Sequence, residues 1–288
     1  MNNEFYIGWL PHMPAGFAKL VKKFLVLLVI LVTGAASAIA LLQKKFDTGN
    51  FEFGTLTEVK GIYFNKPVPL IKVINGRDIW GNISYETIPF VGYGKHGAEG
   101  IITSIEKEKN VLLEARQITI KGTLLYNDGK ILMQLSPDEK PLISVSVKDT
   151  DPALLPQQKE LGEAKVKGEV IDPKCYFGVM KPGEGKVHRD CAIRCILGGI
   201  PPVMVVRNEK GEKNYYLLVG PKGEKINGEV QDFVGEPVEI AARLVQYDDW
   251  TVMYMKEKRG VKRISGSAMF NTSDILSCVA QLIKPTGH

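Results

Sequence analysis

An uncharged apolar run near the N-terminus constrains this chain more than any other feature. Residues 24–42 read FLVLLVILVTGAASAIALL, which is 19 residues without a charged side chain. That length suits an α-helix that crosses the roughly 30 Å hydrocarbon core of a bilayer. Lys19, Lys22 and Lys23 precede the run and Lys44 and Lys45 follow it, a weak bias toward a cytoplasmic N-terminus. We therefore expect a single-pass anchor, with the bulk of the chain on the periplasmic side of a cytoplasmic membrane.

A cleaved signal peptide is the alternative explanation of the same run. Residues 36–38, Ala-Ser-Ala, would serve as a small-residue cleavage site. The segment 1–23 is long for a leader, however, and its Phe5 and Trp9 are side chains favoured at membrane interfaces. We therefore favour an uncleaved anchor preceded by a cytoplasmic segment, for which docking to another membrane subunit is the alternative role.

The rest of the sequence has the pattern of short strands and turns. β-Branched runs are interrupted by Gly, Pro, Asn and Asp, which disfavours long helices. Residues 111–135 alternate between apolar and polar side chains around Asn127-Asp128-Gly129, a hairpin signal. A Gly-punctuated series of about five strands is typical of a small Greek-key barrel of the OB type, with a sandwich as the alternative.

A weak internal repeat indicates two such modules. Val59-Lys60-Gly61 recurs at 166–168, and residues 119–133 align with 239–253. We predict a mainly β protein, with one N-terminal transmembrane helix, two small OB-like β-barrel modules and a short C-terminal helix. The predicted boundaries are a cytoplasmic segment at 1–23, the transmembrane helix at 24–42, a first β-module at 50–145, a linker at 146–163, a second OB-like module at 164–258 and a tail with the short helix at 259–288.

Three of the four cysteines and one of the four histidines lie in one window, residues 172–202. A helix that begins near His188 and ends at a pair of glycines would carry His188, Cys191 and Cys195 at i, i+3 and i+7, on one face. Cys175 follows the preceding strand and needs only to return across a Gly-rich loop. The window therefore predicts a Cys-His-Cys-Cys cluster.

Three interpretations of this cluster stay open. A metal site formed by Cys175, His188, Cys191 and Cys195 is one, because thiolates and imidazole suit zinc and also copper. A disulfide is favoured outside the cytoplasm, with Cys175, Cys191, Cys195 and Cys278 as the candidates. The third is a thiol redox site in which Cys191 and Cys195 exchange with Cys175. No cofactor besides zinc or copper is indicated, and the CxxCH motif of haem attachment is missing.

The stretch GEVIDPKC…H…CAIRC…GGIPPVMVV, followed by YYLLV and VGEPVEIAARL, resembles a group of small exported or membrane-anchored bacterial proteins. Their shared pattern is a strand ending in Asp-x-x-Cys, then His-x-x-Cys-Ala-x-x-Cys, Gly-x-Pro and a further strand. The resemblance covers residues 164–258 and implies an OB-like fold and an exported compartment, but no reaction. The loop before the histidine is longer here than in that pattern. The matching positions are Asp172, Cys175, His188, Cys191, Cys195 and Gly199.

Charge and motifs exclude several functions. The formal charge is +5, with basic and acidic residues interleaved, so no nucleic-acid partner is expected. No serine lies in a nucleophile elbow, and the Gly-rich segment 92–100 lacks the ending of a phosphate loop; we expect a mobile loop with an exposed His96.

These exclusions favour a non-enzymatic function. We predict an accessory subunit of a bacterial envelope assembly, with electron-transfer machinery considered first and the bilayer and other membrane subunits as partners. A periplasmic metallochaperone or thiol-redox protein is the alternative.

Overall fold

The computed structural model describes residues 14–42, 49–77, 83–150, 154–208, 210–256 and 260–265. The chain divides into two units, Met1–Phe46 and Asp47–His288. Trp9, Cys278 and the predicted C-terminal helix lie outside the described residues.

The first unit contributes one long helix, α1 (Ala15–Leu42). Its 28 residues span about 42 Å at 1.5 Å per residue. No side chain of this helix is buried, and its most apolar stretch has a mean hydropathy of 2.8. The predicted helix is therefore confirmed as long and apolar enough to cross a membrane. It begins before the apolar run because the Ala, Leu and Lys residues of 15–23 are good helix formers.

The second unit begins with a closed five-stranded barrel. Its strands follow the order β2–β3–β4–β6–β5, and β5 pairs with β2 to close it. All of these pairings are antiparallel except β4 with β6. Strands β1 and β7 also pair with β5, both in the antiparallel sense. The elements are β1 (Asn50–Phe51), β2 (Thr57–Phe64), β3 (Leu70–Arg77), β4 (Ile83–Gly92), α2 (Glu99–Lys109), β5 (Arg116–Asn127), β6 (Lys130–Leu135), a 3-10 turn (Pro137–Glu139) and β7 (Leu142–Asp149).

A second barrel follows with the same connectivity. Its strands follow the order β8–β9–β10–β12–β11, and β11 pairs with β8 to close it. The parallel pair is β10 with β12, which are the third and fifth strands of this barrel along the chain, as β4 and β6 are in the first. The elements are β8 (Gln158–Ile171), a one-turn π-helix (Cys175–Val179), α3 (Arg189–Leu197), β9 (Val203–Arg207), β10 (Lys213–Val219), α4 (Asn227–Val230), a 3-10 turn (Gln231–Phe233), β11 (Pro237–Tyr247), β12 (Trp250–Met255) and β13 (Val261–Arg263). The fold class is therefore confirmed as two OB-like barrels. The segment 146–163, predicted as a linker, contains the end of β7 and the start of β8.

The repeated glycines occupy equivalent places in the two barrels. A Cβ atom on Gly61 would lie 2.4 Å from the carbonyl oxygen of Lys72, and one on Gly168 would lie 2.3 Å from that of Val205. In both barrels the first strand thus approaches the second too closely for any side chain, which explains the shared Val-Lys-Gly. The aligned segments 119–133 and 239–253 form the β5–β6 and β11–β12 hairpins.

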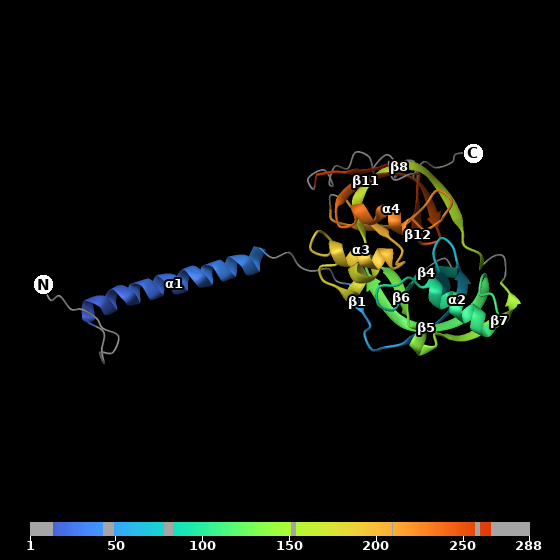
Figure 1. Ribbon diagram of the computed structural model, residues 1–288, viewed down its shortest axis with the longest axis horizontal. Helices are drawn as coiled ribbons and strands as arrows, with labels where there is room; N and C mark the ends of the chain where they lie inside the picture. The colour runs from blue at the N-terminus through green and yellow to red at the C-terminus, as the bar shows by residue number, and fades with distance from the viewer. Residues whose placement is uncertain are drawn as a thin grey trace. The chain divides into compact units, whose positions relative to one another are not determined.

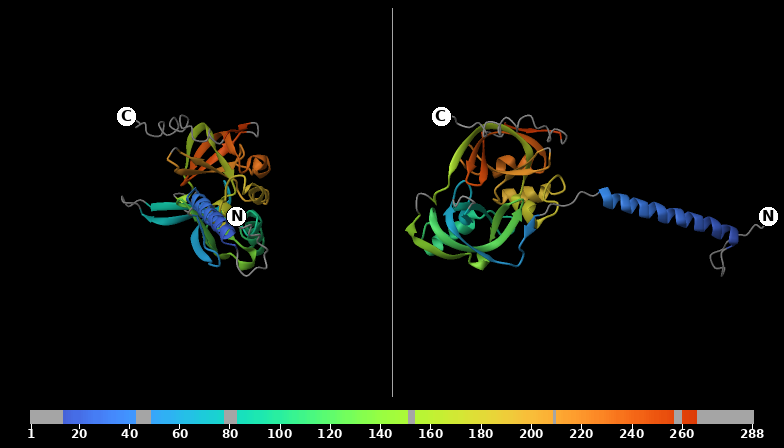
Figure 2. Two further views of the ribbon diagram at one scale, coloured as in Figure 1. Left: turned by 90° about the vertical axis from the view of Figure 1, so that its left-hand side faces the viewer. Right: turned by 180° about the vertical axis from the view of Figure 1, so that it is seen from behind.

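A hydrophobic cluster joins the two barrels, in addition to the core of each barrel. The first barrel contributes Leu125 and Leu132 to it, and the second contributes Phe177 and Trp250. Trp250 is fully buried, and its indole N–H donates to the carbonyl oxygen of Thr87 at 2.9 Å. Figures 1 and 2 show the barrels side by side, with α3 lying where they meet. The cysteine window is therefore placed at a barrel junction.

Candidate metal centre

The cysteine window is the connection between the first two strands of the second barrel. It runs from the end of β8 at Ile171 to the start of β9 at Val203, whereas the first barrel makes the same connection with residues 65–69. The window is therefore an elaboration that only the second barrel carries. In OB-folds this connection is one of those that bind ligands.

Local hydrogen bonds fix Cys175 directly after β8. The Asp172 Oδ1 atom accepts from the backbone N–H groups of Lys174 and Cys175, at 2.9 and 3.4 Å. The π-helical turn that follows packs against the first barrel, where Asn127 Nδ2 donates to the carbonyl oxygen of Tyr176 at 3.2 Å. Cys175 is 5% exposed as a result.

The predicted short helix is confirmed as α3, with His188 at its N-cap position and Gly198 at its C-cap. Gly199 has φ +104°, a left-handed conformation that favours glycine after a helix. Asn227 Nδ2 donates to the Ile196 and Ile200 carbonyl oxygens, at 2.6 and 2.8 Å. These contacts fix the end of the helix that carries Cys191 and Cys195.

The structure brings the predicted ligands together in two groups that share Cys175. In the first, the ligand atoms of Cys175, His188 and Cys191 lie within 4.8 Å of one another. In the second, those of Asp172, Cys175 and Cys195 do so. Cys195 therefore belongs with the Asp172 carboxylate rather than with the imidazole. Cys191 is half-buried and the other four residues are buried.

Two buried polar atoms of the cluster have no partner. Among the described residues, His188 Nε2 and Asp172 Oδ2 lack any hydrogen bond, although His188 is only 4% exposed and Asp172 is fully buried. An unsatisfied buried polar group costs roughly 1–3 kcal/mol. A bound cation would satisfy such atoms. The cluster therefore fits a metal ion in two respects: it offers thiol, imidazole and carboxylate donors, and two of its buried polar atoms lack a hydrogen bond.

Hydrogen bonding and burial together set the protonation of the cluster. The pKa of the Cys175 thiol is raised far above its usual range, chiefly by its hydrogen bond with Cys195 and then by burial and the Asp172 carboxylate. A metal ion must therefore displace the Cys175 proton. Burial lowers the pKa of His188, partly opposed by Asp172. Its imidazole is thus neutral at neutral pH, the form that binds metals.

Two lysines next to the cluster were not predicted from the sequence. Lys95, at the exposed rim, donates from Nζ to Cys191 Sγ at 3.0 Å and to Cys195 Sγ at 3.8 Å. Its pKa is raised, mainly by the hydrogen bond to Cys191. Lys174 is buried and donates to the carbonyl oxygens of Gly92 and Gly94, at 2.8 and 2.7 Å. Its pKa is lowered, chiefly by burial.

The segment predicted as a mobile loop, 92–100, is held in place instead. Gly92 N donates to the His96 carbonyl oxygen at 2.8 Å, and Gly97 N donates to that of Gly198 at 3.0 Å. Lys174 Nζ also donates to the carbonyl oxygens of Gly92 and Gly94 in the same segment. His96 is exposed, as predicted. The loop is therefore a wall of the cysteine cluster, contributed by the first barrel.

The disulfide prediction stays a prediction. Cys175, Cys191 and Cys195 are free thiols in the structure, and Cys278 lies outside the described residues. The sulfur atom of Cys175 lies within 4.8 Å of both other sulfurs. Either pairing would consume the thiol that both ligand groups share, so a disulfide and a metal ion at Cys175 exclude one another.

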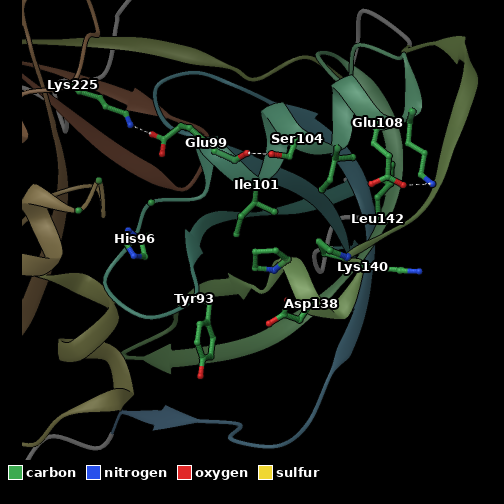
Figure 3. Close-up of a pocket in the computed structure, with 18 residues that line it drawn as sticks. Tyr93, His96, Glu99, Ile101, Ser104, Glu108, Asp138, Lys140, Leu142 and Lys225 are labelled. Atoms are coloured by element: carbon green, nitrogen blue, oxygen red, sulfur yellow. Dashed lines mark hydrogen bonds and ion pairs between the residues drawn. The ribbon is translucent and has the colours of Figure 1, made fainter.

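A groove of about 740 Å³ opens beside the cluster, between α2 and residues 137–142 (Figure 3). Figure 3 shows Tyr93 and His96 at one end and an ion pair between Glu99 and Lys225, whose atoms lie 2.7 Å apart. None of the predicted ligands lines this groove, although the groove and the cluster share part of the 92–100 segment and the Gly198 end of α3 as a common wall. We therefore place the chemistry at the cluster.

A comparison with protein-family models finds no match to this chain, and no curated protein sequence matches it significantly. The resemblance to exported OB-like proteins is thus untested.

Proposed function

We propose that the chain is a membrane-anchored accessory subunit whose second barrel carries a thiolate–imidazole centre for zinc or copper. One observation supports the centre above the others. The buried His188 Nε2 has no hydrogen-bond partner among the described residues, and His188 offers a nitrogen within 4.8 Å of two cysteine sulfurs. A disulfide that only staples a loop has no use for this imidazole, whereas a soft metal ion binds both donor types.

The anchor and the compartment are part of the same proposal. The helix α1 is long and apolar enough to fix the protein in a bilayer. The lysines before the apolar run of the helix favour a cytoplasmic N-terminus, which would put both barrels in the periplasm. A fixed metal centre on an anchored, exported module suits a bacterial envelope assembly, and electron-transfer machinery is the first such assembly to test.

Metal analysis and thiol counting on the detergent-solubilised full chain test the centre. We expect about one equivalent of zinc or copper, together with cysteines that react with alkylating reagents only after chelation. His188→Gln should lose most of the metal, whereas the matched variant His96→Gln should keep it, because His96 is an exposed histidine on the neighbouring loop. A metal-free protein, or equal loading of both variants, contradicts the centre.

The subunit role has a separate test. A membrane protein that functions as an accessory subunit should co-purify with the same partner proteins after mild solubilisation of native membranes. Isolation of the chain alone, from membranes in which it is intact, contradicts that role but leaves the metal centre unaffected.

A metallochaperone or thiol-redox function is the second candidate. It is favoured by Cys191, which is the most exposed ligand and lies within 4.8 Å of Cys175. Transfer of bound metal to an acceptor faster than its spontaneous dissociation supports a chaperone. Reversible conversion of two thiols into one disulfide, without metal, supports a redox protein.

A further inference from the structure

The loop between β4 and α2 connects the first barrel to the cysteine cluster of the second. Lys174 Nζ donates to two carbonyl oxygens of this loop, and Gly97 N donates to the Gly198 carbonyl oxygen at the end of α3. A Cβ atom on Gly198 would lie 1.7 Å from the Lys95 carbonyl oxygen, so the loop and the helix meet backbone to backbone. The position of Lys95 is therefore fixed by both barrels.

This position sets the ammonium group of Lys95 against the sulfurs. Its Nζ atom is 3.0 Å from Cys191 Sγ and 3.8 Å from Cys195 Sγ. The other lysine of the region, Lys174, interacts with the Asp172 carboxylate and with Cys175, but its Nζ atom donates to backbone carbonyl oxygens. Among the described residues, Lys95 is the lysine whose ammonium group donates to a sulfur of the first ligand group, on the side where Cys191 is partly exposed.

Charge counting shows which ion this arrangement favours. When the thiols of Cys175 and Cys191 each release a proton, their two thiolates and the neutral His188 imidazole give a Cu(I) complex one net negative charge. The same three ligands give a Zn(II) complex no net charge. No electron is transferred in either case. The nearby ammonium group attracts the negatively charged Cu(I) complex, and its attraction to the neutral Zn(II) complex is far weaker.

We propose that Lys95, supplied by the first barrel, sets the preference of the Cys175–His188–Cys191 centre for a monovalent soft cation, Cu(I), over Zn(II). This inference rests on the proposed metal centre and names its ion. It also makes the first barrel a functional part of a site whose ligands all come from the second.

Affinities of the full chain in detergent test this proposal, with bicinchoninate as the Cu(I) competitor under reducing, oxygen-free conditions and a chromophoric chelator as the Zn(II) competitor. Lys95→Met should lower the affinity for Cu(I) by about tenfold, as loss of an outer partner of a metal ligand does, and should change that for Zn(II) by less than about twofold. Lys95→Arg should restore the preference for Cu(I). The matched control is Lys225→Met, which removes an ion pair to Glu99 in the neighbouring groove and should change neither affinity.

The outcomes separate this inference from the centre on which it rests. If the unmodified protein binds neither ion, the metal centre itself is wrong and the preference falls with it. If it binds both and Lys95→Met lowers both affinities equally, Zn(II) has recruited a third thiolate such as Cys195, and the proposed preference is wrong. Unchanged affinities in Lys95→Met also overturn it, and leave the centre standing.

Discussion

The contact between α3 and the loop of the first barrel yields a sharp prediction for Gly198→Ala. Gly198 has φ −72°, so its backbone accepts alanine without strain. The new Cβ atom would nevertheless lie 1.7 Å from the Lys95 carbonyl oxygen, where an ordinary contact needs at least 3.4 Å. Since the obstacle is backbone, the loop or the helix must move by about 1.7 Å, half of that ordinary contact.

The cost follows from what this movement breaks. Overpacking of this kind costs about 1–3 kcal/mol. The hydrogen bond from Gly97 N to the Gly198 carbonyl oxygen, now 3.0 Å, would be lost as well, at about 1 kcal/mol. We therefore expect Gly198→Ala to lower the free energy of unfolding by about 2–4 kcal/mol, the sum of these two costs. It should also separate Lys95 from Cys191 without altering any ligand.

Urea unfolding of the full chain in detergent, followed by tryptophan fluorescence, measures this cost, and hydrogen exchange of residues 92–98 locates it. The matched control is Gly100→Ala in α2, where an added Cβ meets nothing within 4 Å. That change should stabilise the protein by about 0.5–1 kcal/mol. If Gly198→Ala unfolds with the same free energy as the unmodified protein and its loop amides exchange unchanged, the proposed wall of the site is wrong.

Other groups give independent tests. Lys72 and Asp248 form an ion pair at 2.9 Å with side chains 1% and 7% exposed; Lys72→Met should cost about 3–5 kcal/mol in urea unfolding, adding Asp248→Asn should recover most of that, and no recovery would contradict the pairing. Because Cys175, whose pKa is raised, and Cys191 must each release a proton on binding, metal affinity measured by chelator competition should rise at least about tenfold per pH unit between about pH 6 and 8, and a flat profile would refute this. Burial raises the pKa of Glu169 above 4.5, so the folded state binds the carboxyl proton more tightly than the unfolded state does. The folded state therefore loses stability as the pH rises from the unfolded pKa to the higher folded pKa. The Tm advantage of Glu169→Gln should therefore grow from about pH 4 to about pH 7, and a constant difference would count against it.

The fold was predictable because its signals are local and repeated. Gly61 and Gly168 mark a close strand approach that excludes every other residue, so the two barrels display it at the same place. The turns of the β5–β6 and β11–β12 hairpins each carry an acidic residue with positive φ, Asp128 and Asp248, and the alignment of 119–133 with 239–253 pairs these two residues. The helix α1 follows from length and hydropathy alone.

The ligand cluster was only partly predictable. His188, Cys191 and Cys195 follow from helical spacing, and the structure adds the division into two groups that share Cys175. Lys95 could not be found in this way, because it is 96 residues from Cys191 in sequence and lies on the other barrel. Nothing in the segment GYGKHGAEG marks its lysine as a partner of sulfur, since that role depends on how two barrels pack.

The hydrophobic cluster at the junction also bears on how this protein can evolve. Phe177, two residues after Cys175, stacks on Trp250 with the ring centroids 6.5 Å apart. Leu125 of the first barrel belongs to the same cluster. Two barrels that share buried side chains cannot drift independently, because a change of volume on one side leaves a void or a clash on the other. Relatives of this chain should therefore show correlated substitutions across the junction, and recombination that exchanges one barrel alone should be rare among them.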